Sequence, residues 1–154
     1  MEKYLQQQKT DCIKIVLFGP ESTGKTSLAV ELAKHYKTVY VKEFAREFLQ
    51  KKMDDQNKVC EIDDLIPIAI GQMNSENILS KKANRILFCD TYLLTTAVYS
   101  RLYFNNFCDP VIDKYSKENK YDLYLLLDID IPWVKDDLRD RPNDRKLFLS
   151  LIHI

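Results

Sequence analysis

The residues best suited to chemistry form an eight-residue run, GPESTGKT, with the spacing GxxxxGK[ST]. Its two glycines allow a tight turn and a close approach to an anion, and successive N–H groups then point inward as a nest for phosphate. The positive end of a following helix reinforces this nest. In such loops the lysine reaches the β- and γ-phosphates and the last hydroxyl ligates Mg²⁺. The run predicts a site for ATP formed by Gly19, Glu21, Ser22, Thr23, Gly24, Lys25, Thr26 and Ser27.

Glu43 and Arg46 lie within one helical turn, just after the second predicted strand. Ligands of doubly wound sheets bind at the carboxyl edge of the strands, where this pair is expected. Glu43 is a candidate to accept a proton from a substrate hydroxyl, and Arg46 is a candidate to hold a substrate or phosphate oxygen. The alternative is an ordinary surface ion pair at the start of a helix.

Asp90 ends the apolar run 86–89 and is a candidate to position Mg²⁺ directly or through water. Its alternative role is to cap the following helix, a role that Thr91 shares. The weaker candidates Asp128 and Asp130 fit turn positions better than ligand positions.

Three arginines near the C-terminus, Arg139, Arg141 and Arg145, alternate with aspartates. An arginine that closes over reacting phosphates stabilises the developing charge and excludes water. The segment is a candidate lid, although a solvated charged helix has the same composition. Trp133 beside it either packs against the lid or stacks on a flat ring.

The candidates form three overlapping sets. The predicted catalytic residues are Lys25, Glu43, Asp90 and Arg139. The predicted substrate-binding residues are Glu43, Arg46, Asp90 and Thr91. The predicted metal ligands are Thr26 and Asp90.

Four short apolar runs, at 13–18, 38–41, 85–90 and 121–128, predict strands buried on both faces of a parallel sheet. Apolar residues at helical spacing predict helices over 25–36 and 44–52, a polar connection at 54–58, and a longer helix over 62–83 broken near Pro67 or Gly71. Strands that alternate with helices imply right-handed crossovers. The predicted fold class is α/β, a P-loop NTPase-type parallel sheet with helices on both faces.

With 154 residues, the chain is long enough for one domain with a single core. We divide it into a polar N-terminal segment (1–12), a P-loop domain (13–146) and an apolar tail (147–154). The tail shows no turn or capping signal and no following element to pack against.

The charges balance, with 23 Lys and Arg against 23 Asp and Glu, so we expect no nucleic-acid partner. No run of about 18 apolar residues and no signal peptide occurs, which predicts a soluble, cytoplasmic protein without a membrane partner. The four cysteines lack metal-ligand spacing and are expected to be structural thiols in a reducing compartment. His35 and His153 are expected at the surface.

The run from Lys14 to Leu49, with its GPESTGK loop and EFARE segment, resembles the bacterial ribosylnicotinamide kinases, the kinase domain of NadR-type proteins. Weaker similarities follow at Phe88–Thr91, at Thr95 and Thr96, in the strand over 121–127, and around Trp133 to Arg139. The resemblance extends over about Lys14 to Arg145.

This resemblance implies transfer of the ATP γ-phosphate to the 5′-hydroxyl of nicotinamide riboside, with Glu43 or Asp90 as the acid or base. Arg46 and the Arg139–Arg145 cluster would handle phosphate or substrate. No adenylyltransferase or DNA-binding domain precedes this part, so we expect a stand-alone kinase module. Family members continue into a further strand and a C-terminal helix, so we expect the last edge strand to be missing. The competing hypotheses are an ATP-binding regulatory or ATPase module without a small-molecule acceptor, and an inactive fragment.

Overall fold

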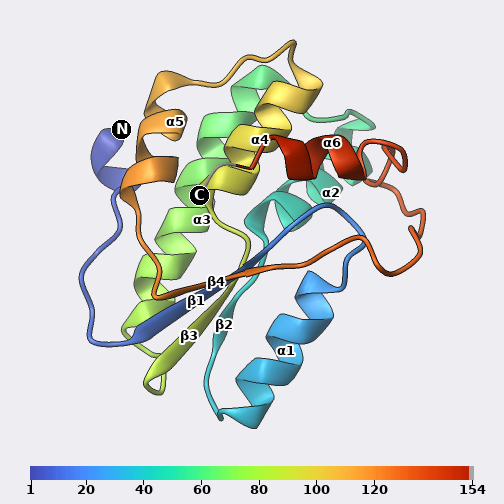
Figure 1. Cartoon of the computed structure of the whole chain (residues 1–154). Coiled ribbons are helices and arrows are strands. Elements are labelled where there is room, and N and C mark those ends of the chain that lie inside the picture. The colour runs from blue at the N-terminus through green and yellow to red at the C-terminus, as the bar shows by residue number, and fades with distance from the viewer. Residues whose placement is uncertain (153–154) are drawn as a thin grey trace.

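The computed structural model describes residues 1–152 and contains a four-stranded parallel sheet with the order β2-β3-β1-β4 (Figure 1). The strands are β1 (Ile13–Phe18), β2 (Tyr40–Val41), β3 (Ile86–Asp90) and β4 (Leu123–Leu126). β1 lies in the interior, so its carboxyl end opens at the middle of one edge of the sheet. Within residues 1–152, no strand pairs with the outer side of β4. The predicted α/β class is confirmed.

Helices cover both faces of this sheet. They are α1 (Lys25–His35), α2 (Phe44–Gln56), α3 (Leu65–Ser80), α4 (Leu93–Tyr103), α5 (Pro110–Glu118) and α6 (Arg145–Ser150), with short 3₁₀ helices at Glu2–Tyr4 and Ile62–Asp64. Figure 1 shows α1 on one face and α3 and α4 on the other, with α5 further out. None of the helices in this described part of the chain is long and apolar enough to cross a membrane.

Alternation along the strands explains this two-sided cover. In β1, Val16 and Phe18 face the cluster formed with α4 and α6, whereas Leu17 faces Ala29 and Ala33 of α1. β3 alternates in the same way, and both strands are buried over most of their length. Two buried faces favour apolar residues at successive positions, which is why these runs show no regular polar alternation.

α3 is continuous, so the predicted break near Pro67 or Gly71 is wrong. Pro67 is the third residue of the helix, in the first turn, where backbone N–H groups have no intrahelical partner to lose. Gly71 has another role, because a Cβ there would collide with the ring of Phe44. The glycine therefore lets the start of α2 lie directly on α3.

Other element boundaries also differ from the prediction, and β4 is four residues shorter than expected. α2 runs through the expected polar connection as far as Gln56 and ends at Asn57, whose φ of 51° is left-handed. β2 contains only Tyr40 and Val41, against the four residues expected. His35 is exposed as predicted, and His153 lies outside the described residues.

The C-terminal region differs from the expectation in two ways. Residues 147–150 belong to α6, and Phe148 is buried against Tyr99 of α4 with ring centroids 4.9 Å apart, so the described part of the tail packs on an element that precedes it in the chain. Residues 133–144 are irregular, so the charged-helix alternative is wrong. We call residues 131–145 the covering segment.

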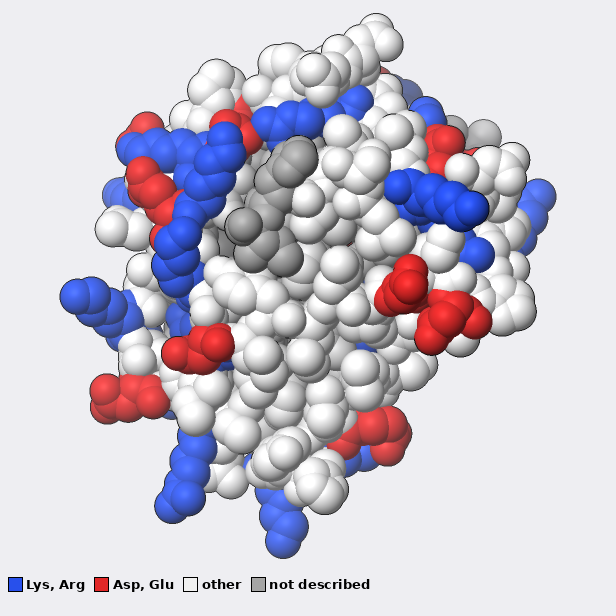
Figure 2. All heavy atoms as spheres, in the orientation of Figure 1, with Lys and Arg blue, Asp and Glu red and all other residues white. Residues whose placement is uncertain are grey.

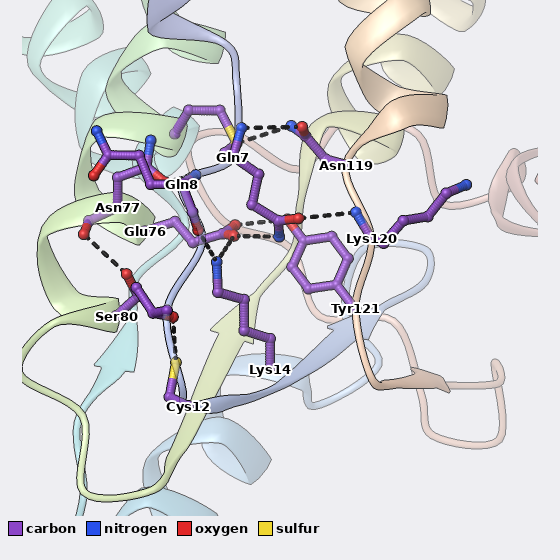
Figure 3. Close-up of polar contacts among 12 residues, drawn as sticks. Gln7, Gln8, Cys12, Lys14, Glu76, Asn77, Ser80, Asn119, Lys120 and Tyr121 are labelled. Carbon is purple, nitrogen blue, oxygen red and sulfur yellow. Dashed lines mark hydrogen bonds and ion pairs between the residues drawn. The ribbon is translucent and has the colours of Figure 1, made fainter.

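A buried polar cluster closes the amino edge of the sheet (Figure 3). The Glu76 carboxylate on α3 accepts hydrogen bonds from Gln7 (2.9 Å), Lys14 (3.4 Å) and Tyr121 (2.6 Å). Glu76 is 0% exposed and Lys14 is 6% exposed. Burial raises the pKa of Tyr121 well above its usual value, so it remains a donor. We call these four residues the amino-edge network.

Charged side chains of both signs are interspersed on the face shown in Figure 2, around a broad uncharged area. This distribution agrees with the balanced composition. The four cysteines are all free, and Cys89 is buried in the core.

Candidate functional site

The GPESTGKT run forms the turn between β1 and α1, at the carboxyl edge of the sheet. Gly19 has φ 146°, and a Cβ there would lie 2.6 Å from the Leu127 carbonyl oxygen. Gly24 caps α1 with φ 85°, and Ser22 also lies in the left-handed region with φ 60°. Both glycines are therefore required by the backbone, as the motif predicts.

Lys25 is 8% exposed, and its ammonium donates to the Pro20 carbonyl at 2.8 Å. Burial lowers the pKa of Lys25, and the charges of Glu43 and Asp90 oppose this shift. The lysine is therefore held inside its own loop, within the field of two carboxylates. A group that carries negative charge and reaches the loop would compete for the same ammonium.

Asp90 ends β3 next to the loop. Its Oδ2 accepts the Thr26 hydroxyl at 2.5 Å, and its buried Oδ1 has no hydrogen-bond partner within residues 1–152. Burial raises the pKa of Asp90, while the Thr26 hydrogen bond and Lys25 lower it. Thr91 follows with φ 71°, a strained conformation for a β-branched residue. The strain coincides with the point where β3 turns into the site.

Glu43 precedes the first residue of α2 and makes no side-chain cap, although it occupies the N-cap position. Burial raises the pKa of Glu43, while Lys25 lowers it. Its side chain lines the cavity described below. The carboxylate is thus directed at the loop instead of at its own helix.

The covering segment crosses the phosphate loop and is fastened to it. Val134 N–H donates to the Ser22 hydroxyl at 2.9 Å, and Arg145 donates to the Ser22 and Ile131 carbonyls. Arg46 forms two hydrogen bonds with the Asp136 carboxylate. The segment therefore lies closed over the loop.

Asp136 organises the covering segment around Arg139. Its Oδ1 accepts the backbone N–H groups of Leu138 (2.9 Å) and Arg139 (3.0 Å). Burial alone would raise the pKa of Asp136, but the hydrogen bonds from Arg46 and from these amides lower it to about 2. This arrangement places Arg139 in the cavity wall.

One cavity of about 390 Å³ joins these groups. Its polar part is formed by the loop from Glu21 to Ser27 together with Glu43, Arg46 and Arg139. Its apolar part is formed by side chains of α2, α3, α4 and the covering segment. These are Leu49, Leu65, Ile68, Tyr103, Phe104 and Leu138. The cavity can accept a molecule with one anionic or polar end and one flat or apolar end.

Most of the predicted site residues come together at this cavity. Asp90 is absent from the wall itself but reaches it through Thr26. The guanidinium of Arg141 lies 4.3 Å from the Tyr103 ring centroid and pairs with Asp144. Arg145 donates to the covering segment at the Ile131 carbonyl. Of the three arginines, only Arg139 lines the cavity. Asp128 binds the next backbone N–H, as a turn residue does.

Local motifs did not predict that Gln72, Thr95 and Cys60 line the cavity. Gln72 and Cys60 belong to no recognisable motif, and Thr95 appeared only within a weak similarity. Burial raises the pKa of Cys60 to about 11, which makes it a neutral thiol. The buried face of α3 also carries Glu76, Asn77 and Ser80, so a polar residue at position 72 does not by itself indicate a site.

A GxxxxGK[ST] loop between a buried parallel strand and a helix defines a P-loop NTPase-like domain. The chain belongs to the AAA-domain family, whose model matches residues 14–153.

Curated relatives and solved structures agree with this class. The chain is 30% identical over 143 residues to the trifunctional NAD biosynthesis/regulator proteins NadR of Salmonella typhimurium and Escherichia coli, covering 90% of this chain and 34% of each relative. It therefore spans about a third of their length. It also matches NadR structures in complex with NR and in complex with NAD and AMP-PNP, each with TM-score 0.72 and 26% identity, covering 92% of this chain and 39% and 40% of those chains.

Proposed function

We propose that this chain is an ATP-dependent small-molecule kinase that phosphorylates the 5′-hydroxyl of nicotinamide riboside to give nicotinamide mononucleotide. The observation that carries the proposal is the single cavity joining the phosphate loop, a carboxylate and an apolar wall. The similarity to NadR proteins, one of them solved with NR and one with AMP-PNP, supports the choice of substrates.

Glu43 is the residue that accepts the proton of the acceptor hydroxyl. It lines the cavity, whereas Asp90 is engaged by Thr26 and does not. Burial raises the pKa of Glu43, which brings the carboxylate closer to the basicity that a general base needs. Lys25 and Arg139 stabilise negative charge on the transferred group, and the covering segment excludes water.

Thr26 and Asp90 fit a Mg²⁺ ion. Hydroxyl and carboxylate oxygens are the ligands that this ion takes, and the buried Oδ1 of Asp90 has no other partner within residues 1–152. No group of three or more His, Cys, Asp or Glu in that part of the chain is placed to hold a metal. When bound, the ion would neutralise phosphate charge, with phosphate and water oxygens as its remaining ligands.

The test compares wild type with Lys25→Ala and Lys25→Met in a coupled ADP-release assay, using nicotinamide riboside and a panel of other nucleosides. Both variants should lose at least about 10²–10³-fold in transfer rate, because the ammonium is removed from the reacting phosphates. Denaturant melts should show that both remain folded, since burial disfavours this charge in the free protein. Lys25→Met also keeps most of the apolar stem.

Three results contradict the proposal. Transfer that survives in both variants removes Lys25 from the mechanism. Binding of ATP without transfer to any nucleoside indicates a regulatory or ATPase module. An unfolding midpoint that ATP does not shift indicates an inactive fragment, because a ligand that binds the folded state must stabilise it.

A further inference from the structure

Two buried polar groups in the cavity wall have no role in the mechanism above. Gln72 on α3 is 3% exposed and Thr95 on α4 is 6% exposed, and both line the cavity. The Gln72 Nε2 and the Thr95 Oγ1 have no hydrogen-bond partner within residues 1–152. Buried polar groups are almost always hydrogen-bonded, so these two atoms point to a ligand.

The orientation of the Gln72 amide is fixed by the protein. Its Oε1 accepts the backbone N–H of Phe44 at 2.8 Å, and only the oxygen of the amide can do so. The ring of Phe44 lies against Gly71, where a side chain would collide with it. The start of α2 is thus fixed on α3, and the two N–H donors of Gln72 remain for another molecule.

Both groups lie at the reacting end of the cavity. Phe44, which holds the Gln72 oxygen, directly follows Glu43. Thr95 lies in the first turn of α4, which begins just after Asp90 and Thr91. The apolar part of the wall, in contrast, includes Leu49, Tyr103 and Phe104, which lie further along α2 and at the end of α4.

The chemistry of the two groups limits what they can bind. Both are neutral, whereas phosphate would be held by Lys25 and Arg139. A primary amide offers two donors and a hydroxyl offers one donor and two acceptor sites, a set that complements other hydroxyls. We propose that Gln72 and Thr95 bind the ribose hydroxyls of the acceptor nucleoside and so select ribosides over deoxyribosides, an inference that rests on the proposed function for the identity of the acceptor.

The experiment measures the dissociation constants of nicotinamide riboside and its 2′-deoxy and 3′-deoxy analogues by calorimetry. The proteins are wild type, Thr95→Val and Gln72→Glu. Val keeps the shape of Thr without the hydroxyl, and Glu still accepts the Phe44 N–H but has no amide donor. Ser100→Ala is the control, because Ser100 is a buried hydroxyl on the same helix that donates to the Phe107 carbonyl at 2.6 Å and is not in the cavity wall.

Wild type should bind at least one deoxy analogue about 10- to 100-fold more weakly than the riboside, since a buried donor or acceptor is then unpaired. Each variant should bind the riboside about 10- to 100-fold more weakly than wild type does. With the deoxy analogue that lacks the hydroxyl bound by the altered residue, the variant and wild type should have nearly the same affinity. Ser100→Ala should bind all three compounds as wild type does. Thr95→Val should be at least as stable as wild type in denaturant melts, whereas Ser100→Ala should be less stable.

The inference is overturned if each variant weakens the binding of all three compounds by the same factor. It is also overturned if neither variant weakens binding of the riboside, or if wild type binds no nucleoside. Failure of the proposed function gives a different result. If wild type binds the riboside with the expected hydroxyl dependence but releases no ADP with ATP present, the inferred ribose-binding site is supported and the proposed kinase activity is contradicted.

Discussion

Two buried polar clusters lie at opposite edges of the same sheet and differ in how their hydrogen bonds are satisfied. In the amino-edge network, Glu76 receives donors from Gln7, Lys14 and Tyr121 (Figure 3). At the carboxyl edge, one atom each of Gln72, Asp90 and Thr95 has no partner within residues 1–152. Gln72 and Glu76 are one turn apart on α3. One helix thus supports a cluster built for stability and a site that remains incomplete until a ligand arrives.

The largest expected effect on folding comes from breaking the amino-edge network. Glu76→Ala leaves the buried ammonium of Lys14 with only the Gln8 carbonyl as partner (3.3 Å). Removal of one member of a buried pair typically costs about 3–5 kcal/mol of unfolding free energy. Urea melts should show this loss. The double variant Lys14→Met with Glu76→Met should recover only part of it, because neither charge is then buried alone but the Tyr121 hydroxyl still lacks its acceptor.

This comparison fails if Glu76→Ala changes the unfolding free energy by less than about 1 kcal/mol, the value typical of an exposed pair. The exposed pair of Glu31 and Lys34 on α1 provides the matched control. Lys34→Ala should lie within about 0.5 kcal/mol of wild type.

Asp90→Asn should maintain or raise the folding stability while it lowers the rate of phosphate transfer. Burial raises the pKa of Asp90, so its charge is disfavoured in the folded protein without a cation. A group whose folded pKa is raised contributes stability at pH values below its unfolded pKa and loses it as the pH rises through the folded pKa. At pH 7 Asp90→Asn should therefore be as stable as wild type or more so, while transfer falls by about 10²-fold because a charged ligand of Mg²⁺ is removed.

Paired urea melts from pH 4 to pH 8 and the ADP-release assay check this prediction. The difference between Asp90→Asn and wild type should grow with pH in favour of the variant. A variant that is less stable at pH 8 than at pH 4, relative to wild type, would place Asp90 in a satisfied network like that of Glu76.

The difference between the two edges also explains what the sequence could predict. The phosphate loop, the strand that ends on Asp90 and the strand that precedes Glu43 follow from local spacing and composition, and the structure contains all three. Gln72 joins the site through a contact with Phe44, 28 residues away in the sequence. Lys14 was hidden in an apolar strand because its partner Glu76 is 62 residues away. Such partners are set by tertiary packing and leave no local pattern.

The conformation of the covering segment also depends on a tertiary contact that the local sequence does not reveal. Its arginines predicted a lid or a charged helix, but an irregular chain forms because Asp136 binds two of the segment's own amides and the guanidinium of Arg46. Short polar side chains that accept nearby backbone N–H groups compete with a helix. Arg46 therefore fastens the segment in this structure, a role that its position beside Glu43 did not indicate.

Asp136→Asn tests this fastening and should give the smallest effect. The amide oxygen can still accept both backbone N–H groups, as Oδ1 does now, but the side chain loses the charge that pairs with Arg46. Because the Arg46 and Asp136 side chains are 40% and 32% exposed, we expect a loss of about 1 kcal/mol at pH 7. The folded pKa of Asp136, about 2, lies below its usual value, so its contribution is present above pH 4 and is lost as the pH falls toward 2.

The measurement is the difference in unfolding free energy between Asp136→Asn and wild type at pH 7, 5, 4 and 3. The difference should be constant from pH 7 to pH 5 and shrink at pH 3. Salt should also reduce it, since partly exposed pairs are screened. A difference that is independent of pH would mean that Asp136 acts through its backbone hydrogen bonds alone. The segment would then be held by Ser22 and Arg145, and the Arg46 guanidinium would be available to a substrate.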